Sequence, residues 1–424
     1  MTTRGEKQHD VIVVGGGPAG ASTAFALSRA GARVLVLDRA TFPRPKPCAE
    51  YLSPQASRVL SEMGALDKVE AAGAAHLDGM IVRAPNGAKL RGDFVAQHGY
   101  SAFRNRGLAL RRVLLDPILL DCARSAGAEV REGARVIGLS RDDGGRVNGV
   151  QVLERNGPTR ELRASLVIGA DGLRSVVANR LRLAHTSRWW PRRIALVAHY
   201  ENFGDITDWG EMHVERGVGY VGLAAVENGL TNVAMVVPAS FGREIASGRT
   251  AFFQAWLRAR PQLAPRVKHA RRVTGVLGTG PFASHARRAW APGAALVGDA
   301  ADFFDPFTGE GIYSGLRGGE MLAPFAMRAL GATSVLDADR ALRAYDRARS
   351  AEFRGKWMVE KLINAAVGFA PAMNYFARTL ESRKDMADLL VGVTGDFVPA
   401  SEVLRLGYLI NLFRSPARRV VTEP

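Results

Sequence analysis

The sequence contains very little cysteine, with only Cys48 and Cys122 among its 424 residues. This scarcity excludes a disulfide framework and a cysteine-rich zinc site, and it suits a reducing cytoplasm. The eight histidines show no metal-ligand spacing, so we expect no metal site. Long apolar runs are also missing, so we expect no transmembrane helix, and the polar first ten residues are not typical of a signal peptide. We therefore expect a cytoplasmic protein.

Acidic residues are scarce relative to basic ones, with 41 Asp and Glu against 57 Lys and Arg and a net charge of +16. The basic residues are scattered and are not interleaved with aromatic residues, which argues against a nucleic acid partner. An anionic cofactor together with an anionic membrane surface or substrate would account for the charge. A plain compositional bias toward arginine would account for it as well.

The dominant pattern of the sequence occupies residues 10–38. An apolar run typical of a buried parallel strand is followed by Gly15, Gly17 and Gly20 with the spacing G-x-G-x-x-G. A helical segment and a second apolar run come next, and this run ends at Asp38. Such a loop lets the backbone approach a pyrophosphate at a helix N-terminus, while the terminal acid can bond a ribose hydroxyl. The pattern predicts a dinucleotide site.

The rest of the chain alternates between α/β segments and segments typical of an antiparallel sheet. We expect a Rossmann-type α/β domain built from three separate stretches, an inserted antiparallel β-sheet domain that covers the substrate, and a helical C-terminal part. The expected boundaries are 8–76, 105–182 and 277–330 for the α/β domain, 77–104 (a hairpin) and 183–276 for the inserted sheet, and 331–424 for the helical part. We also expect one helix over 108–127, despite Pro117, and one strand over 129–139.

Two further motifs combine glycine with an acidic residue. Residues 169–172 read G-A-D-G, and residues 298–301 read G-D-A-A, followed by Pro306 and the triplet G-E-G at 309–311. With these three motifs the sequence resembles the flavoprotein superfamily that includes geranylgeranyl reductases, aromatic hydroxylases (monooxygenases) and flavin-dependent halogenases. The resemblance implies FAD as the cofactor and makes the α/β part an FAD-binding domain.

The resemblance also implies roles for individual residues. Asp38 would hold the adenosine ribose, Arg112 would lie near the ribose and pyrophosphate, and Val136 would contact the adenine through its backbone. Asp299 would bond the ribityl chain, and the backbone of residues 309–312 would point a helix N-terminus at the flavin. The complete expected FAD site comprises Gly15, Gly17, Pro18, Ala19, Gly20, Asp38, Arg39, Arg112, Val136, Asp171, Gly298, Asp299, Pro306, Gly309, Glu310, Gly311 and Ile312.

Residues 46–54, which read KPCAEYLSP, resemble the motif K-x-C-G-E/G-G-L-S-P of the geranylgeranyl reductase branch. In that branch the cysteine lies near the flavin, which implies a catalytic role for Cys48. Ala49 and Tyr51 replace two glycines of the motif, so a small packing residue is the alternative for Cys48. The halogenase motif W-x-W-x-I-P is absent. Tyr220 stands where many reductases carry Y-x-W-x-F-P, so it is a second catalytic candidate, with a packing aromatic as the alternative.

We expect an FAD-dependent oxidoreductase that reduces a C=C bond of a lipophilic substrate, for example an isoprenoid, by hydride transfer from the flavin. The alternative is a monooxygenase that hydroxylates an aromatic or polyketide substrate through a flavin C4a-hydroperoxide. A flavin-carrying protein without enzyme activity is a third hypothesis. No second G-x-G-x-x-G occurs, so we expect the external reductant to be NAD(P)H visiting a cleft or a protein electron carrier.

The C-terminal region contains an apolar helical stretch followed by Arg414, Arg418 and Arg419. An apolar face beside arginines suits anionic lipid headgroups, and a lipophilic substrate would have to be collected from a bilayer. Peripheral membrane contact through residues 402–424 is therefore one expectation. Packing of the same helix onto the protein core is the other.

Overall fold

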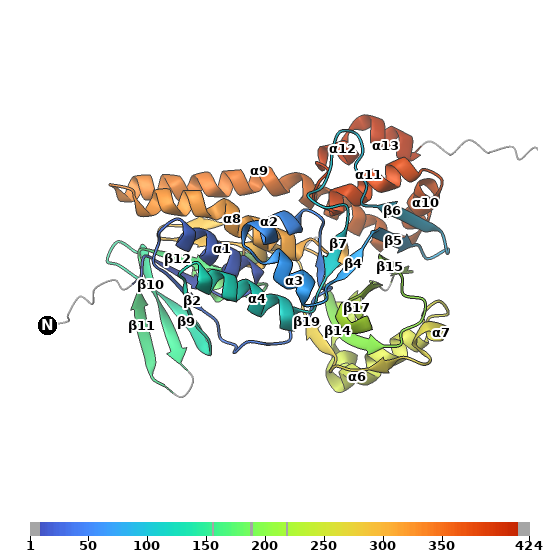
Figure 1. Cartoon of the computed structure of the whole chain (residues 1–424), viewed down its shortest axis with the longest axis horizontal. Helices are drawn as coiled ribbons and strands as arrows, with labels where there is room; N and C mark the ends of the chain where they lie inside the picture. Colours follow the sequence, from blue (N-terminus) through green and yellow to red (C-terminus); the bar gives the residue numbers. More distant parts are fainter. Residues whose placement is uncertain (1–8, 155–156, 187–189, 218, 414–424) are drawn as a thin grey trace, which may run out of the picture.

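A six-stranded, mostly parallel sheet forms one layer of the computed structural model, which describes residues 9–154, 157–186, 190–217 and 219–413 (Figure 1). Its strands, in spatial order, are β21 (Trp290–Ala291), β22 (Ala294–Leu296), β12 (Leu166–Gly169), β1 (Val11–Val14), β2 (Val34–Leu37) and β8 (Glu129–Arg131). All neighbouring strands run parallel except β21 and β22. Every residue of β1, β2 and β12 is buried, as their uninterrupted apolar composition predicts.

Helix α1 (Pro18–Arg29) follows β1 and packs against α4 (Arg112–Ser125) and α8 (Gly311–Leu330). The contact with α8 is close because α8 presents glycine there: a Cβ on Gly319 would lie 2.6 Å from the backbone nitrogen of Thr23. Helix α8 begins at the end of the motif that starts at residue 298 and closes with the G-E-G triplet at 309–311. Its packing on α1 therefore brings this motif against the loop between β1 and α1.

An eight-stranded sheet forms the second large layer. Its strands are β18 (Arg271–Arg272), β14 (Arg193–Glu201), β17 (Thr231–Pro238), β16 (Gly219–Ala225), β15 (Trp209–Glu215), β5 (Gly79–Arg83) and β6 (Lys89–Asp93), with β19 (Leu277–Thr279) also paired to β14. The sheet is antiparallel apart from one parallel pair, β15 with β5. Helix α6 (Gly242–Arg258) covers one face through Phe253, Trp256 and Leu257. Side chains of the other face pack in part on Phe307 and on Val367 and Met373 of the C-terminal helices.

The C-terminal region is helical as far as it is described, in agreement with the sequence pattern. Helix α9 (Val335–Gly368) is the longest element and runs along α8 toward the remaining helices (Figure 1). These are α10 (Ala370–Glu381), α11 (Lys384–Thr394), α12 (Ser401–Leu404) and α13 (Leu406–Phe413), of which α10 and α11 pack on β6. Within the described residues, none of the helices combines the length and apolar character needed to cross a membrane.

The remaining elements are three small sheets and short helices. The first sheet contains β11 (Thr159–Arg163), β10 (Val147–Glu154) and β9 (Ala134–Arg141). The second contains β13 (Ala184–Thr186), β20 (Ser284–Ala286) and β23 (Asp302–Phe303). The third contains β3 (Tyr51–Leu52), β7 (Gly107–Ala109) and β4 (Ala75–Leu77). The helices are α2 (Ala56–Glu62), α3 (Leu66–Ala71), α5 (Val176–Arg180), α7 (Ala264–Val267) and the 3-10 turns η1 (Glu227–Gly229), η2 (Ala239–Phe241), η3 (Gly298–Ala300) and η4 (Pro306–Thr308).

Two expected elements differ from those observed. The strand expected over 129–139 is two strands, because Gly133 adopts a left-handed φ of 70° and turns the chain from β8 in the large sheet to β9 in a small one. The helix expected over 108–127 is confirmed as α4 with Pro117 inside it, but it begins at Arg112 because the preceding residues pair in β7.

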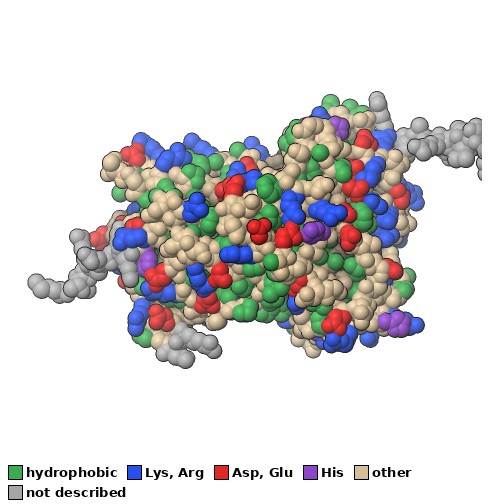
Figure 2. All heavy atoms as spheres, viewed as in Figure 1, with side chains coloured by type: hydrophobic (Ala, Val, Ile, Leu, Met, Phe, Trp, Pro, Cys, Tyr) green, Lys and Arg blue, Asp and Glu red, His purple; other side chains and the backbone are tan. Residues whose placement is uncertain are grey.

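On the face that Figure 2 draws, Lys and Arg side chains are interspersed with Asp and Glu. Helix α13 buries Tyr408 against the protein, while Leu406, Ile410 and Phe413 are 72%, 43% and 64% exposed. One side of this helix therefore packs and the other is an exposed apolar face. The three arginines of the sequence pattern lie outside the described residues.

Candidate active site

Two of the three fingerprint glycines are required by the packing of the protein itself. Gly15 has a φ of 104°, and a Cβ there would lie 2.5 Å from the carbonyl oxygen of Ala170. A Cβ on Gly20 would lie 1.8 Å from the carbonyl oxygen of Gly15. Neither position admits a side chain without a backbone shift, so the strand, the turn and the helix interlock only with glycine here.

Gly17 is different because the space in front of it is open. Its φ of −76° is ordinary for any residue, and a Cβ would lie 3.6 Å from Arg112 Nη2 and 3.8 Å from Arg44 Nη2. The nearest groups are thus guanidinium tips rather than backbone. An open backbone position at the start of α1, faced by cations, fits the close approach of a diphosphate.

Three cationic side chains, Arg44, Lys46 and Arg112, lie around this open space. Burial and the neighbouring Arg112 lower the pKa of Lys46, with Asp299 acting in the opposite direction. Asp116 accepts hydrogen bonds from Arg112 Nε and Nη2 at 2.5 and 2.8 Å and pairs with Arg44 Nη1 at 3.1 Å. The guanidinium groups of Arg112 and Arg44 are nearest to the open position at Gly17, and such donors fit the diphosphate of FAD.

The opposite wall is the segment that leads into α8. Gly298 has a φ of 61°, and its Cβ would lie 2.8 Å from the Cβ of Ala19, so this turn lies directly against the fingerprint loop. Gly309, with a φ of 74°, ends the turn η4, and α8 begins at Gly311 with its first turn lining the cavity. A helix N-terminus at this place stabilises negative charge on a bound group.

A single cavity connects these walls and brings most of the predicted site residues together. Its lining includes Gly17, Pro18, Ala19, Cys48, Arg112, Tyr220, Gly298, Asp299, Pro306, Gly309, Glu310, Gly311 and Ile312. The other predicted residues, which do not belong to this lining, are Gly15, Gly20, Asp38, Arg39, Val136 and Asp171.

Two of the residues outside the lining, Asp38 and Asp171, make hydrogen bonds within the fold. Asp38 accepts hydrogen bonds from the backbone nitrogens of Gly16 and Ala40 at 2.7 and 2.8 Å, which closes the fingerprint turn. Asp171 Oδ2 accepts from the backbone nitrogen of Val176 at 2.6 Å at the start of α5. Val136 is buried in β9, and Arg39 is exposed. Contact of these four residues with FAD stays a prediction.

The sequence matches a protein family described as "FAD binding domain" over residues 8–350, which is most of the chain. The chain belongs to this FAD-binding family. It is an FAD-dependent oxidoreductase of the superfamily that the three motifs indicated. The cavity between the fingerprint loop and α8 is the predicted FAD site.

Relatives of this flavoprotein come from several organisms. Digeranylgeranylglycerophospholipid reductase 1 from Methanopyrus kandleri is 33% identical over a match covering 76% of this chain and 81% of the relative. Menaquinone reductase from Mycobacterium tuberculosis is 28% identical, with 74% and 75% covered. Conditioned medium factor receptor 1 from Dictyostelium discoideum is 26% identical over 74% of this chain, and the match spans only 62% of that protein.

Solved structures with the same fold include two other flavoproteins. The flavoprotein/dehydrogenase from Cytophaga hutchinsonii superposes with a TM-score of 0.80 at 20% identity, covering 91% of this chain and 92% of that chain. The flavin-dependent brominase Bmp2 superposes with a TM-score of 0.79 at 19% identity, covering 91% and 93%. At this identity the likeness shows the fold alone.

The two residues predicted to be catalytic both line the cavity of the flavoprotein. Cys48 is half-buried, burial raises the pKa of its thiol, and its Sγ accepts a hydrogen bond from the backbone nitrogen of Glu50 at 3.3 Å. Tyr220 is 2% exposed, and its hydroxyl donates to Asp305 Oδ1 at 2.5 Å. Its ring meets Phe307 edge-on at 4.9 Å. The catalytic role of both residues stays a prediction.

A buried ion pair beneath Tyr220 was missed by sequence reasoning. Asp305 Oδ2 lies 2.8 Å from Arg193 Nη1, which also donates to Asn364. Burial raises the pKa of Asp305, and Arg193 opposes this. Asp305 stands directly before Pro306 in a motif that the sequence did reveal, so it could have been found. Arg193 and Asn364 carry no local signal, because only the fold brings β14 and α9 together.

Glu310, directly before α8, and Glu360 of α9 add further acidic groups to the cavity wall. Burial raises the pKa of Glu310 to about 8, with Lys356 acting in the opposite direction. Burial and the neighbouring Glu310 raise the pKa of Glu360 well above its ordinary value. Glu360 Oε1 accepts a hydrogen bond from the backbone nitrogen of Asp305 at 2.8 Å, and Lys356 pairs with Asp396.

The eight-stranded sheet closes the cavity with small and apolar side chains. They come from alternate positions of its central strands and from β5: Ala195, Val197, Gly222, Ala224, Ala234, Val236, Met80 and Met212. A Cβ on Gly222 would lie 3.1 Å from Met212 Sδ, so larger residues would fill this part of the cavity. The wall offers apolar contact and few hydrogen-bonding groups.

Glu211 is a charged exception at the edge of this wall. Arg266 donates to its two oxygens at 2.9 Å each, and His213 Nε2 lies 2.9 Å from Oε2. Burial alone would raise the pKa of Glu211, but the hydrogen bonds from His213 and Arg266 lower it to about 2. The carboxylate is therefore held in its charged form by its own partners.

Proposed function

We propose that this flavoprotein reduces a carbon–carbon double bond of a lipophilic substrate. The observation that carries the proposal is the course of the cavity, which runs from the basic groups at Gly17 to the apolar face of the eight-stranded sheet. One end fits an anionic cofactor, and the other fits an apolar molecule. The relatives named as reductases of a geranylgeranyl lipid and of menaquinone support the proposal.

Bound FAD would supply the hydride. The chain itself orients the two reactants and excludes water. Small side chains on β14, β16 and β17 leave room for the substrate, while Phe282, Phe303 and Phe307 line the cavity near η4 and shield it. The first turn of α8 stabilises negative charge at the cofactor end. NAD(P)H or a protein electron carrier is the expected external reductant.

Saturation of a double bond consumes one hydride and one proton, and we propose Glu360 as the source of the proton. This residue lines the cavity, and Asp305 fixes one of its oxygens. Burial and the neighbouring Glu310 raise its pKa well above the ordinary value, which favours the protonated form that a proton donor needs. The nearby charge of Lys361 favours the carboxylate that remains after the transfer.

Single turnover without oxygen tests the reaction. Protein reduced with one equivalent of dithionite is mixed with a geranylgeranyl lipid, the flavin absorbance is followed, and the mass of the product is measured by mass spectrometry. We expect the absorbance of oxidised flavin to return and the product to gain two hydrogen atoms. No reaction without oxygen, together with insertion of one oxygen atom when oxygen is admitted, would instead establish the monooxygenase alternative.

The proton source is tested in the same assay. Glu360→Gln should slow reoxidation by the substrate and leave reduction by dithionite unchanged. Glu352→Gln, on the same helix, is the matched control, since this exposed residue pairs with Arg317 at the surface. Equal rates for Glu360→Gln and the wild type would remove Glu360 from the reaction without affecting the reductase proposal.

A further inference from the structure

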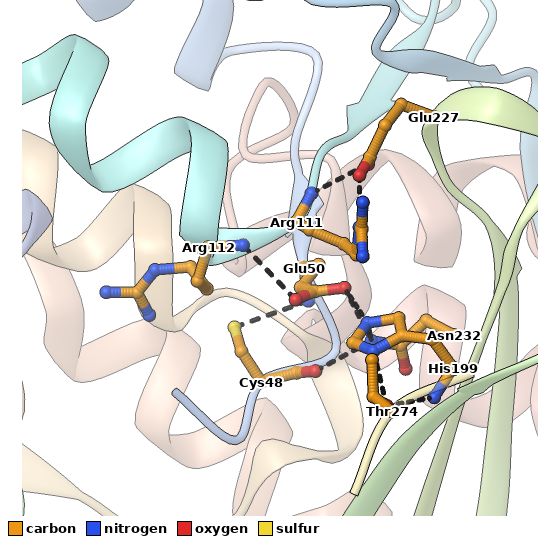
Figure 3. Close-up of polar contacts among 8 residues, drawn as sticks. All are labelled: Cys48, Glu50, Arg111, Arg112, His199, Glu227, Asn232 and Thr274. Carbon is orange, nitrogen blue, oxygen red and sulfur yellow. Dashed lines mark hydrogen bonds and ion pairs between the residues drawn. The ribbon is translucent and has the colours of Figure 1, made fainter. Parts of the chain in front are cut away.

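A buried carboxylate, Glu50, joins the loop of Cys48 to the eight-stranded sheet (Figure 3). Glu50 is 2% exposed, and its Oε2 lies 2.7 Å from His199 Nε2 and accepts from Asn232 Nδ2 at 2.8 Å. Its Oε1 accepts from the backbone nitrogen of Arg112 at 3.2 Å. These partners belong to β14, β17 and α4, so one carboxylate connects the substrate-facing sheet with the helix whose arginine faces the FAD site.

The Glu50 carboxylate can only accept, so its hydrogen bond with Nε2 assigns the proton of a neutral His199 ring to that nitrogen. The backbone nitrogen of His199 donates to Thr274 Oγ1 at 2.9 Å, which leaves the Thr274 hydroxyl free to donate to His199 Nδ1 at 3.2 Å. Nδ1 then accepts, and Nε2 donates to Glu50. Both oxygens of Glu50 and both ring nitrogens of His199 have partners, and a fully satisfied buried network of this kind is rigid.

Two further contacts extend the network to Cys48. Asn232 Nδ2 also donates to the carbonyl oxygen of Cys48 at 2.9 Å, and the backbone nitrogen of Glu50 donates to Cys48 Sγ at 3.3 Å. Glu50 adopts a left-handed φ of 63°, which turns the chain so that its side chain enters the sheet while the thiol stays at the cavity. We propose that Glu50 is a positioning residue that, with His199 and Asn232, fixes the Cys48 thiol in the cavity wall.

Glu50 also influences the charge of this thiol. Burial raises the pKa of Cys48, the Glu50 carboxylate raises it further, and Arg112 lowers it. The charged and titratable groups around this part of the cavity are Arg44, Lys46, Glu50, Arg112, Asp116, His199 and Asp299. Removing the charge of Glu50 while keeping its shape should therefore make the Cys48 thiolate easier to form, which loss of a purely structural contact would not do.

A second buried carboxylate at the same boundary provides a matched control. Glu227 is fully buried, pairs with Arg111 Nε and accepts from the backbone nitrogen of Arg111 at 3.1 Å. Like Glu50, it joins the start of α4 to the sheet (Figure 3). Its hydrogen bonds go to Arg111 instead of the Cys48 loop, so Glu227→Gln reproduces the loss of a buried charge without the effect on the thiol.

The test follows the reaction of Cys48 with iodoacetamide over a series of pH values. It uses the FAD-loaded protein in a Cys122→Ser background, which leaves a single thiol. We expect Glu50→Gln to move the pH midpoint of alkylation downward and to raise the rate several-fold below that midpoint, with FAD content unchanged. We expect Glu227→Gln to match the background. An unchanged midpoint in Glu50→Gln, or equal shifts in both variants, would overturn the proposal.

His199 gives a second test that does not depend on the folding of Glu50→Gln. His199→Leu removes the donor to Glu50 and should raise the alkylation rate, because the loop loses its anchor. His199→Gln restores an N–H donor and should return the rate toward the background; no difference between the two variants would count against the network. The positioning role of Glu50 rests on the proposed reductase function in one respect only, namely that Cys48 matters for turnover. Thiol chemistry needs no substrate, so the two proposals can fail separately.

Discussion

Gly17 and Gly20 respond in opposite ways to the same substitution, glycine to alanine. A Cβ on Gly17 has room, with its nearest atom at 3.6 Å and a φ of −76° that alanine adopts freely. A Cβ on Gly20 would lie 1.8 Å from a carbonyl oxygen, well inside contact distance. Gly17 therefore leaves room for a ligand, whereas Gly20 lets helix α1 lie close to the carbonyl oxygen of Gly15.

The expected magnitudes follow from this difference. Gly17→Ala should leave the free energy of unfolding of the apoprotein unchanged or raise it by up to about 1 kcal/mol, because alanine restricts the unfolded chain. Its FAD affinity should fall about tenfold or more, which corresponds to ~1.4 kcal/mol, because the methyl group occupies the approach of the diphosphate. Gly20→Ala should lower the free energy of unfolding by about 3 kcal/mol, since the backbone must shift.

Urea unfolding of the apoproteins and fluorescence titration with FAD measure the two quantities separately. Wild-type FAD affinity in Gly17→Ala would show that the diphosphate does not approach this position. A Gly20→Ala variant as stable as the wild type would contradict the packing of α1 against β1.

Four other predictions concern the cofactor, the thiol, acid stability and the membrane. Asp299→Ala should fold normally but lose most of its FAD, as flavin absorbance after purification will show. Cys48→Ser should lower turnover with FAD content intact, and unchanged turnover would favour a packing role. Because the folded-state pKa of Glu211 is lowered from 4.5 to about 2, its stabilisation is complete above pH 4.5 and is lost as pH falls toward 2. Glu211→Gln should therefore flatten the acid-unfolding profile in that window. The chain should sediment with anionic vesicles at low salt, and removal of residues 402–424 should weaken this because α13 exposes an apolar face; binding unaffected by the truncation would argue for packing instead.

Features that depend on neighbours in the sequence could be predicted from it. The spacing of Gly15, Gly17 and Gly20 between two apolar runs identified β1, α1 and β2, because each requirement acts within a few residues. Three separated motifs together indicated the superfamily, and the match over residues 8–350 confirms it. The break at Gly133 was missed, since a single glycine inside an apolar strand pattern does not reveal that the chain changes sheets there.

Features that depend on the register of distant strands could not be predicted. His199 and Asn232 lie opposite each other in the pairing of β14 with β17, and they meet Glu50 across 149 and 182 residues of sequence. A histidine or an asparagine within an apolar strand carries no sign of its partner. Arg193 reaches Asp305 in the same way, across 112 residues.

The flavin content of the purified protein tests the FAD site most directly. We predict a yellow protein that carries about one FAD per chain, releases it on denaturation and takes it up again as apoprotein when FAD is added. A well-folded but colourless protein that takes up no added FAD would contradict the site between Gly17 and Asp299, and with it the reductase chemistry proposed there.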